Sequence, residues 1–215
     1  MSRTGRPREF DRDNALQRAM ELFWAQGYEG TTLADLQKAM GDITAPSFYA
    51  AFGSKEALFR EAVELYKKTQ GAPVVEALAE GPTARSSIEG MLWAAVESVC
   101  GQGKPRGCLM VLGAINCMPA NKGVEDFMRD QRALRGRFIR QRLQRGVAEG
   151  DVPAATDLHA LTSFYTSIVD GMAIGAKDGA SRKSLGAIVD CAMAAWHPLA
   201  GRNTAKRERR HSDGL

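Results

Sequence analysis

The sequence is poor in the residues that most often bind metals or form disulfides. It has four cysteines and three histidines among 215 residues. The cysteines form no C-x-x-C pair, and no two histidines stand four residues apart, the spacing that would bring them to one face of a helix. We therefore expect free thiols in a reducing compartment, no metal site and no cofactor. The four thiols are those of Cys100, Cys108, Cys117 and Cys191.

Long apolar stretches are also missing. The longest apolar run, CLMVLGAINCMP at 108–119, is far shorter than the ~20 residues that cross a bilayer as a helix. The N-terminal stretch MSRTGRPREFDRDN is polar and basic, and it lacks the apolar segment of a secretion signal. These absences predict a cytoplasmic protein with no membrane partner.

The net charge of +4 does not by itself indicate a nucleic-acid partner. Residues 1–60 carry eight Lys or Arg and eight Asp or Glu, so this part of the chain is neutral. The excess of positive charge lies at the two ends, in the first eight residues and in GRNTAKRERRH at 201–211. We expect 201–215 to form a disordered basic tail. The function must therefore be sought in local patterns.

The alternation of Val, Ile and Thr that is typical of strands is absent, whereas apolar residues recur at helical spacing along almost the whole chain. Capping residues, glycines and prolines mark the ends of the helices. The sequence thus predicts an all-α fold of about nine helices, with a break across 71–83. The expected helices cover 12–26, 33–40, 45–52, 55–70, 88–99, 107–115, 122–149, 156–177 and 182–197.

Two of these helices, 33–40 and 45–52, are short and are joined by a tight turn at MGDIT (40–44). These are the proportions of a helix-turn-helix, in which the second helix enters the major groove of DNA. Two core helices joined by a glycine turn show the same spacing. The spacing alone therefore leaves a DNA-binding role and a purely structural role open.

The residue types are more specific than the spacing. The stretch TTLADLQKAMGDITAPSFYAAFGSKEALF (31–59) resembles the helix-turn-helix of the TetR family of bacterial repressors. In that family a threonine opens the second helix, an aromatic-Tyr-x-x-Phe block ends the third, and Ser-Lys-Glu starts the fourth. The resemblance covers about residues 10–60. It departs at GDIT (41–44), where the family usually has Ala-Gly-Val-Ser, so the tilt of helix 45–52 stays open.

The resemblance divides the chain into three parts. Residues 1–55 would form a three-helix DNA-binding module with a basic N-terminal arm. Residues 56–200 would form a larger helical domain for effector sensing and dimerisation, followed by the tail at 201–215. The implied partners are a double-stranded operator with palindromic half-sites and a second copy of the chain.

The resemblance also assigns DNA contacts. Tyr49 would direct its phenol at the DNA backbone, as the family's tyrosine does, and Lys55 would add a cation on the other side. Thr31 and Thr32 stand at a helix N-terminus, where free amides and hydroxyls suit a phosphate. Alternatively, Tyr49 is a core aromatic with a solvated tip and Lys55 a solvated surface residue. The remaining groove-facing candidates are Thr44, Ala45, Pro46, Ser47 and Ala50.

Two further features belong to this module. Arg6 and Arg8, in an arm that resembles the one preceding the family's first helix, would reach phosphates or a minor groove. A solubilising tail is the alternative for this arm. Phe48 and Phe52 are expected to pack into the core of the module instead of facing DNA.

The resemblance implies a homodimer formed by the last two long helices of each chain. Small residues on both helices allow the close packing that such an interface needs. Packing within one chain is the alternative explanation. These small residues are Ser167, Gly171, Gly175, Gly186, Ala187, Ala192, Ala194 and Ala195.

The segment PRGCLMVLGAINCM (105–118) is similar to the corresponding part of TetR-family repressors that sense electrophiles and oxidants, such as the N-ethylmaleimide repressor. This similarity makes Cys108 the candidate sensing thiol, with Cys117 as a resolving thiol. A helix start, Lys104 and Arg106 would favour the thiolate of Cys108. Lys177 occupies a place where that repressor also has a lysine.

Other roles for the helical domain at 56–200 remain open. Cys108 would be an inert core thiol if it is simply buried. Copper binding by Cys108, Cys117, Met110 and Met118 fits the softness of these ligands but has no spacing signature. The arginine-rich stretch 128–146 is interpreted as a solvated helix face. A pocket for a small apolar inducer would be lined by Met91, Trp93, Met110, Phe127 and Phe164.

Three functional classes are compatible with these patterns. The first is a repressor that is released from its operator by a signal acting on the domain at 56–200. The second is a small thiol-dependent helical enzyme, although the chain lacks a Cys/His pairing, a phosphate loop and a carboxylate cluster. The third is a dimeric adaptor that does not bind DNA. The sequence leaves the inducer, the operator and the choice between repression and activation undetermined, although repression and no catalysis are expected.

Overall fold

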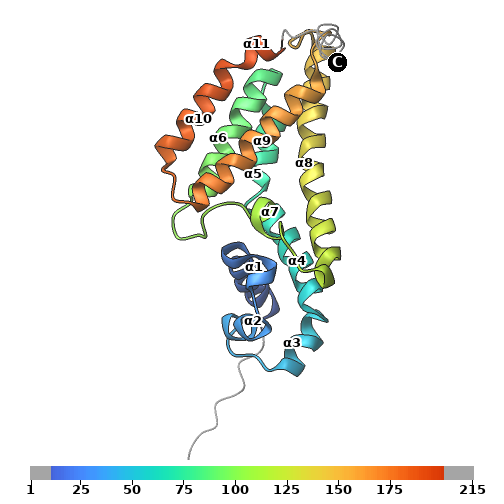
Figure 1. The fold of residues 1–215 in the computed structure, drawn as a ribbon, viewed down its shortest axis with the longest axis vertical. Coiled ribbons are helices and arrows are strands. Elements are labelled where there is room, and N and C mark those ends of the chain that lie inside the picture. The colour runs from blue at the N-terminus through green and yellow to red at the C-terminus, as the bar shows by residue number, and fades with distance from the viewer. Residues whose placement is uncertain (1–10, 201–215) are drawn as a thin grey trace, which may run out of the picture.

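The computed structural model describes residues 11–200. The predicted arm with Arg6 and Arg8 and the predicted tail at 201–215 lie outside the described residues. Within the described range the chain has eleven α-helices and one 3-10 helix and no β-strand element, which confirms the all-α prediction (Figure 1). The elements are α1 (Arg12–Gly30), α2 (Leu33–Ala39), α3 (Ala45–Phe52), α4 (Lys55–Thr69), α5 (Ala72–Glu80), α6 (Ala84–Cys100), α7 (Leu109–Leu112), η1 (Pro119–Asn121), α8 (Lys122–Glu149), α9 (Leu158–Lys177), α10 (Arg182–Ala194) and α11 (Trp196–Ala200).

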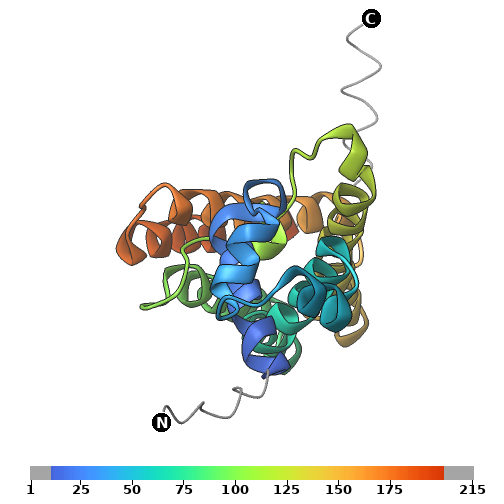
Figure 2. The same cartoon turned by 90° about the horizontal axis from the view of Figure 1, so that it is seen from below.

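The helices α1–α3 and the start of α4 form a head at one end of the molecule (Figure 1); Figure 2, seen from below, shows these blue and cyan helices in front. Each of the four helices begins at a residue whose side-chain oxygen accepts a hydrogen bond from a first-turn amide, which fixes where the helix starts. Aromatic rings fill the core of the head, and Phe23 meets Phe59 edge-on with ring centroids 5.0 Å apart. The capping residues are Asp11, Thr32, Thr44 and Ser54.

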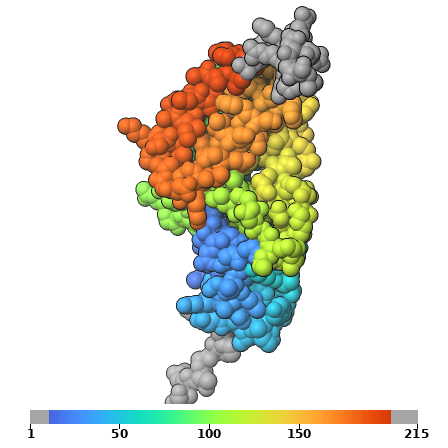
Figure 3. Space-filling view, viewed as in Figure 1, coloured from blue at the N-terminus to red at the C-terminus, as the bar shows by residue number. Residues whose placement is uncertain are grey.

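The larger body contains α5, α6 and α8–α11 around an apolar core of its own, distinct from the core of the head. Helices α4 and α8 run lengthwise along one side (Figure 1). In the space-filling view of Figure 3, the orange and red segments of α9 and α10 form a broad outer surface of the body. None of the helices in the described range is both long and apolar enough to cross a membrane.

Three sequence predictions about helices need correction. The expected break at 71–83 contains α5, because Pro73 stands in the first turn, where its missing amide costs no helical hydrogen bond. The helix expected at 107–115 is reduced to the four residues of α7. The chain also continues past α10 into the short α11, which was expected to be part of one helix.

Regular helical geometry in α1 is interrupted at Gly27, as the sequence predicted. Gly27 has φ 74°, a left-handed value that glycine adopts without strain. A Cβ at this position would lie 3.3 Å from the carbonyl oxygen of Gly113. The break therefore also lets α1 approach the segment around α7. The domain boundary proposed at residue 55 falls at the start of the continuous helix α4 and stays a prediction.

Candidate functional site

The turn between α2 and α3 contains two residues in the left-handed backbone conformation and is held by two hydrogen bonds. Gly41 has φ 95° and Asp42 has φ 59°, and Asp42 is the one non-glycine residue with positive φ in the described range. The backbone amide of Ile43 donates to the carbonyl of Gln37 at 3.2 Å, and Gln37 Nε2 donates to the carbonyl of Ile43 at 3.1 Å. Two consecutive left-handed residues thus direct α3 away from α2 despite the early glycine.

Helix α3 separates an apolar face from an exposed face. Phe48 and Phe52 are buried in the core of the head, as predicted, with 0% and 4% of their surface exposed. Tyr49 is 51% exposed, and its ring meets Phe48 edge-on at 5.4 Å. The exposed face of the helix and its cap also carries small residues, of which Ala45 is half-buried. The others are Thr44, Pro46, Ser47 and Ala50.

The two threonines before α2 differ in their surroundings. Thr32 is exposed and forms a capping box with Asp35, whose backbone amide donates to the Thr32 hydroxyl at 3.1 Å. Thr31 is fully buried, and its hydroxyl donates to the carbonyl of Gly27 at 2.7 Å. Thr31 therefore closes the end of α1, and its burial contradicts the prediction that it contacts a phosphate.

Lys55 is half-buried instead of standing free at the surface. Its ammonium lies 4.2 Å from the ring centroid of Tyr28, a cation–π contact. Burial lowers the pKa of Lys55, and the nearby Glu29 carboxylate offsets part of that effect. The lysine thus links α4 to the end of α1, and its contact with the DNA backbone stays a prediction.

The segment 107–113 is hydrogen-bonded to α1 at both of its ends. The indole nitrogen of Trp24 donates to the carbonyl of Gly107 at 3.0 Å, and the amide of Tyr28 donates to the carbonyl of Gly113 at 2.7 Å. This segment contains Cys108, which packs against both the core of the body and the core of the head. Two hydrogen bonds thus join this segment directly to α1.

Cys108 is half-buried immediately before α7 and lines the largest cavity described below. Its thiol lies beside the hydroxyl of Tyr66 on α4. Burial, and then the neighbouring Cys108 thiol, raise the pKa of Tyr66 well above its ordinary value. Tyr66 therefore faces the thiol as a neutral phenol at physiological pH.

The three cations expected near Cys108 bind other groups. Lys104 Nζ donates to Gln70 Oε1 at 2.7 Å, and Arg106 donates to the carbonyl of Ala180. Lys177 Nζ donates to the carbonyl of Ala25 at 2.7 Å, which adds a contact between α9 and α1. Because α7 has only four residues, its dipole is also small. Each of the three cations thus has a neutral hydrogen-bond acceptor of its own, and their effect on Cys108 stays a prediction.

Cys117 occupies a different environment. It packs at the edge of the core of the head. Burial raises the pKa of the Cys117 thiol, and the charges of Glu29 and Glu125 raise it further. A raised pKa disfavours the thiolate that disulfide exchange requires, so the structure weakens the prediction of a resolving role.

A cavity of about 370 Å³ lies between α4, α5, α6, α8 and α9. Of the five predicted pocket residues, only Met110 lines it. Met91 is fully buried in the core of the body, and Phe127 packs under the Arg60 guanidinium at 4.3 Å. Trp93 fills the space beside Gly186, and Phe164 lines a separate hollow at the surface of α9 and α10.

The contribution of α8 to this cavity cannot be recognised from the helical pattern of the sequence. The arginine-rich stretch was interpreted as a solvated face, yet Arg132 and Arg135 line the cavity, because α8 is long enough to contact several helices. Phe138 on the same helix is the one sequence feature that could have indicated a buried position for Arg135, because it stands three residues further on and so lies on the same side of the helix. Within the described range no group of three or more His, Cys, Asp or Glu residues is arranged to hold a metal.

The outer faces of α9 and α10 expose small and apolar side chains. Gly171 has open space around it, and Ile174 is 46% exposed. Gly186 is buried, and its missing side chain accommodates the Trp93 ring, so this glycine serves packing within one chain. Ala192 is also buried. The exposed residues of this stripe are Ser167, Gly171 and Ile174 on α9 and Ala187, Ile188, Cys191 and Ala194 on α10.

Comparisons with known proteins extend over nearly the whole chain. Residues 15–62 match the profile described as bacterial regulatory proteins, tetR family. The chain is 34% identical over 196 residues to the HTH-type transcriptional repressor ComR of Escherichia coli (strain K12), with 91% of this chain and 93% of ComR covered. It is 26% identical over 193 residues to the HTH-type transcriptional repressor BdcR of the same strain, with 89% of each chain covered.

A solved structure agrees in fold. The TetR family transcriptional regulator CifR, as a triple cysteine mutant complexed with 26-base-pair double-strand operator DNA, superposes with a TM-score of 0.85. The two chains are 44% identical, and the match covers 89% of this chain and 100% of that chain.

Proposed function

Because the chain belongs to the TetR family of bacterial regulatory proteins, we propose that it represses transcription by inserting α3 into the major groove of an operator. The observation that carries this proposal is the two-faced α3, which buries Phe48 and Phe52 and exposes Tyr49 beside small side chains. The exposed phenol suits a phosphate, and the small residues permit close approach to the base edges. CifR, complexed with double-strand operator DNA, supports the assignment.

Two heads are needed for tight binding, because one small module makes few phosphate contacts. We place the dimer interface on the exposed stripe of α9 and α10, which would set the two copies of α3 about 34–36 Å apart or a multiple of that distance. The proposal includes a cytoplasmic location, where operator DNA is found, and no catalytic activity.

The experiment is a titration of operator DNA, identified by footprinting upstream of the protein's own gene, at several salt concentrations. Removing the Tyr49 hydroxyl in Tyr49→Phe should weaken binding about tenfold or more, since a hydrogen bond to a charged group contributes about 1.5–3 kcal/mol. Tyr165→Phe is the matched control, because this tyrosine donates to the carbonyl of Ala192 inside the body. Equal affinities for both variants would refute the contact, and a logarithmic salt plot without a steep slope would refute operator binding altogether.

We further propose that repression is relieved when an electrophile modifies Cys108. The Cys108 thiol packs between the head and the body, in a segment bonded at both ends to α1. When a maleimide reacts, sulfur forms a bond to one alkene carbon, the double bond opens, and the thiol proton passes through solvent to the other carbon. The added group must occupy space at the junction, so the modified and unmodified proteins favour different head positions. CifR is complexed with operator DNA with three of its cysteines replaced, so those thiols of CifR are not needed for that complex.

A second candidate signal is a ligand that binds without a covalent bond. The cavity of about 370 Å³ supports this candidate, because its volume falls within the range of about 300–1,000 Å³ typical of small-molecule sites.

A further inference from the structure

The cavity has a mostly apolar wall that also contains polar side chains, and two of these are arginines. Its aliphatic and phenylalanine side chains come from α5, α6, α8 and α9 and from the segment that follows Cys108. Arg132 and Arg135 enter the wall from α8. The apolar residues include Val74, Val99, Met110, Leu134, Phe138 and Val169.

Both arginines have buried N–H groups that no described residue accepts. Arg132 makes no hydrogen bond and no ion pair with any residue in the described range, and its Nη1 atom is shielded from solvent. Arg135 pairs with Asp170 through Nη2, but its Nε atom is buried without an acceptor. An unpaired buried donor is costly, so most such groups in folded proteins have a partner.

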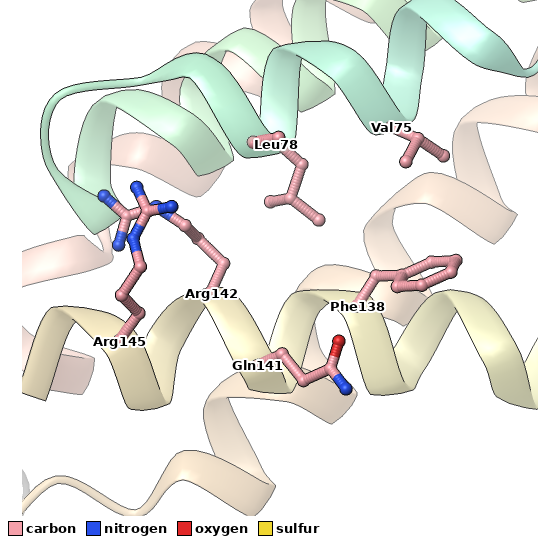
Figure 4. A pocket seen from close by; sticks show the side chains of 7 residues that line it. Val75, Leu78, Phe138, Gln141, Arg142 and Arg145 are labelled. Atoms are coloured by element: carbon pink, nitrogen blue, oxygen red, sulfur yellow. The ribbon is translucent and has the colours of Figure 1, made fainter.

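A third arginine of the same helix shows the ordinary arrangement. Arg142 is buried beside a smaller hollow of about 220 Å³ between α5 and α8 (Figure 4). Its Nε donates to Ser87 Oγ at 2.7 Å, and its two terminal nitrogens donate to Glu149 and to the carbonyl of Gly81. All three side-chain nitrogens of Arg142 are thus bonded within the protein. Arg132, in contrast, has no such partner for its buried Nη1 atom.

The charges around the cavity leave Arg132 uncompensated. Lys67 is bonded to Glu64 and to Gln131, and Asp170 is committed to Arg135. Glu76, the one carboxylate in the wall, is an exposed residue. The wall therefore offers a positive site with free N–H donors next to an apolar chamber.

We propose that this cavity binds an organic anion, a carboxylate carried on a hydrocarbon body, with the carboxylate held by Arg132 and Arg135. A guanidinium is suited to a carboxylate because its N–H groups match the two oxygens. The hydrocarbon body occupies the apolar part of the cavity, which it shares with the Cys108 thiol. The role of this anion as an inducer rests on the proposed function. Its binding to the cavity does not, because that binding requires no DNA.

The test is isothermal titration of the full-length protein with octanoate and, separately, with 1-octanol, in the absence of DNA. Octanoate should bind at one molecule per chain, and more tightly than 1-octanol. Arg132→Gln should weaken octanoate binding at least tenfold, while it leaves 1-octanol binding unchanged. Arg140→Gln is the matched control, because this arginine is exposed on the same helix outside the cavity wall. Since Arg132 has no internal partner, its substitution should not lower the unfolding temperature.

The proposal is overturned if octanoate does not bind, if 1-octanol binds equally well, or if Arg132→Gln and Arg140→Gln behave alike. Arg132→Lys tests whether the planar guanidinium matters in addition to the positive charge. This variant keeps the charge, and its affinity for octanoate should fall between the affinities of the wild type and Arg132→Gln. Operator affinity of the same ligand-free samples tests the repressor assignment independently. Octanoate binding with no operator affinity would refute the proposed function alone.

Discussion

The indole nitrogen of Trp24 donates a buried hydrogen bond of 3.0 Å to the carbonyl of Gly107, which lies 83 residues further along the chain. Gly107 directly precedes Cys108, and Trp24 lies on the first helix of the head. This bond is one of two hydrogen bonds that connect the candidate sensor segment to α1 of the DNA-binding module. The strength of this bond should therefore influence both the free energy of unfolding and the release of the protein from its operator.

We expect Trp24→Phe to lower the free energy of unfolding by about 1–3 kcal/mol, because the Gly107 carbonyl loses its buried donor. Operator affinity without inducer should stay close to the wild-type value, but treatment with N-ethylmaleimide should release less DNA. Urea unfolding and fluorescence anisotropy measure the two effects. Trp93→Phe is the control, because the Trp93 indole donates no hydrogen bond in the described range, and an identical response of both variants would remove Trp24 from the coupling.

Replacing Cys108 by serine should leave operator binding intact and abolish the release caused by N-ethylmaleimide. The oxygen of serine is a much weaker nucleophile at neutral pH than a thiolate. Cys100→Ser is the control, since Cys100 is a half-buried thiol at the end of α6, outside the 107–113 segment, the cavity wall and the α9/α10 stripe. Anisotropy before and after alkylation, with mass spectrometry to locate the adduct, gives the answer. Unchanged release from the Cys108→Ser protein would end the thiol proposal.

A charge on the outer face of α9 should disrupt the proposed dimer. We expect Ile174→Arg to shift the protein to monomers in light scattering and to weaken operator binding at least a hundredfold, because both half-sites are no longer bound together. Ile115→Arg is a closely matched control, since the two isoleucines are 46% and 44% exposed. A monomeric wild-type protein, or a dimeric Ile174→Arg variant, would show that the interface lies elsewhere.

The contact between the head and η1 should depend on pH. Asn121 Nδ2 and the amide of Met118 each donate to Glu29 Oε1 at 2.8 Å, and the Asn121 bond is the main reason that the pKa of Glu29 is lowered. A lowered pKa means that the stabilisation is present above the unfolded pKa of about 4.3 and is lost as the pH falls through the folded value. Glu29→Gln should therefore be less stable than the wild type at pH 7, with the difference shrinking by pH 3.

Urea midpoints across this pH range measure the effect of Glu29→Gln. Glu80→Gln serves as the reference, because Glu80 is exposed and makes no hydrogen bond in the described range. A constant difference between Glu29→Gln and the wild type from pH 7 to pH 3 would show that the carboxylate charge contributes nothing.

The sequence by itself determined the elements that depend on neighbouring residues. Thr44, Pro46 and Phe52 define where α3 starts, how its first turn forms and which face is buried, because capping and helical periodicity act over three or four residues. The TetR resemblance likewise rests on one continuous stretch, and it led to the correct family.

Only the tertiary structure decided the roles that depend on contacts between distant segments. It buried Thr31 under Gly27, placed Lys55 over Tyr28, and turned Arg132 from an expected solvated face into a cavity wall. Each of these outcomes depends on which helices pack together, and residues far apart in the chain set that packing. A helical pattern shows that a side chain lies on one face of its helix, but the neighbouring helices determine whether that face meets solvent, core or cavity.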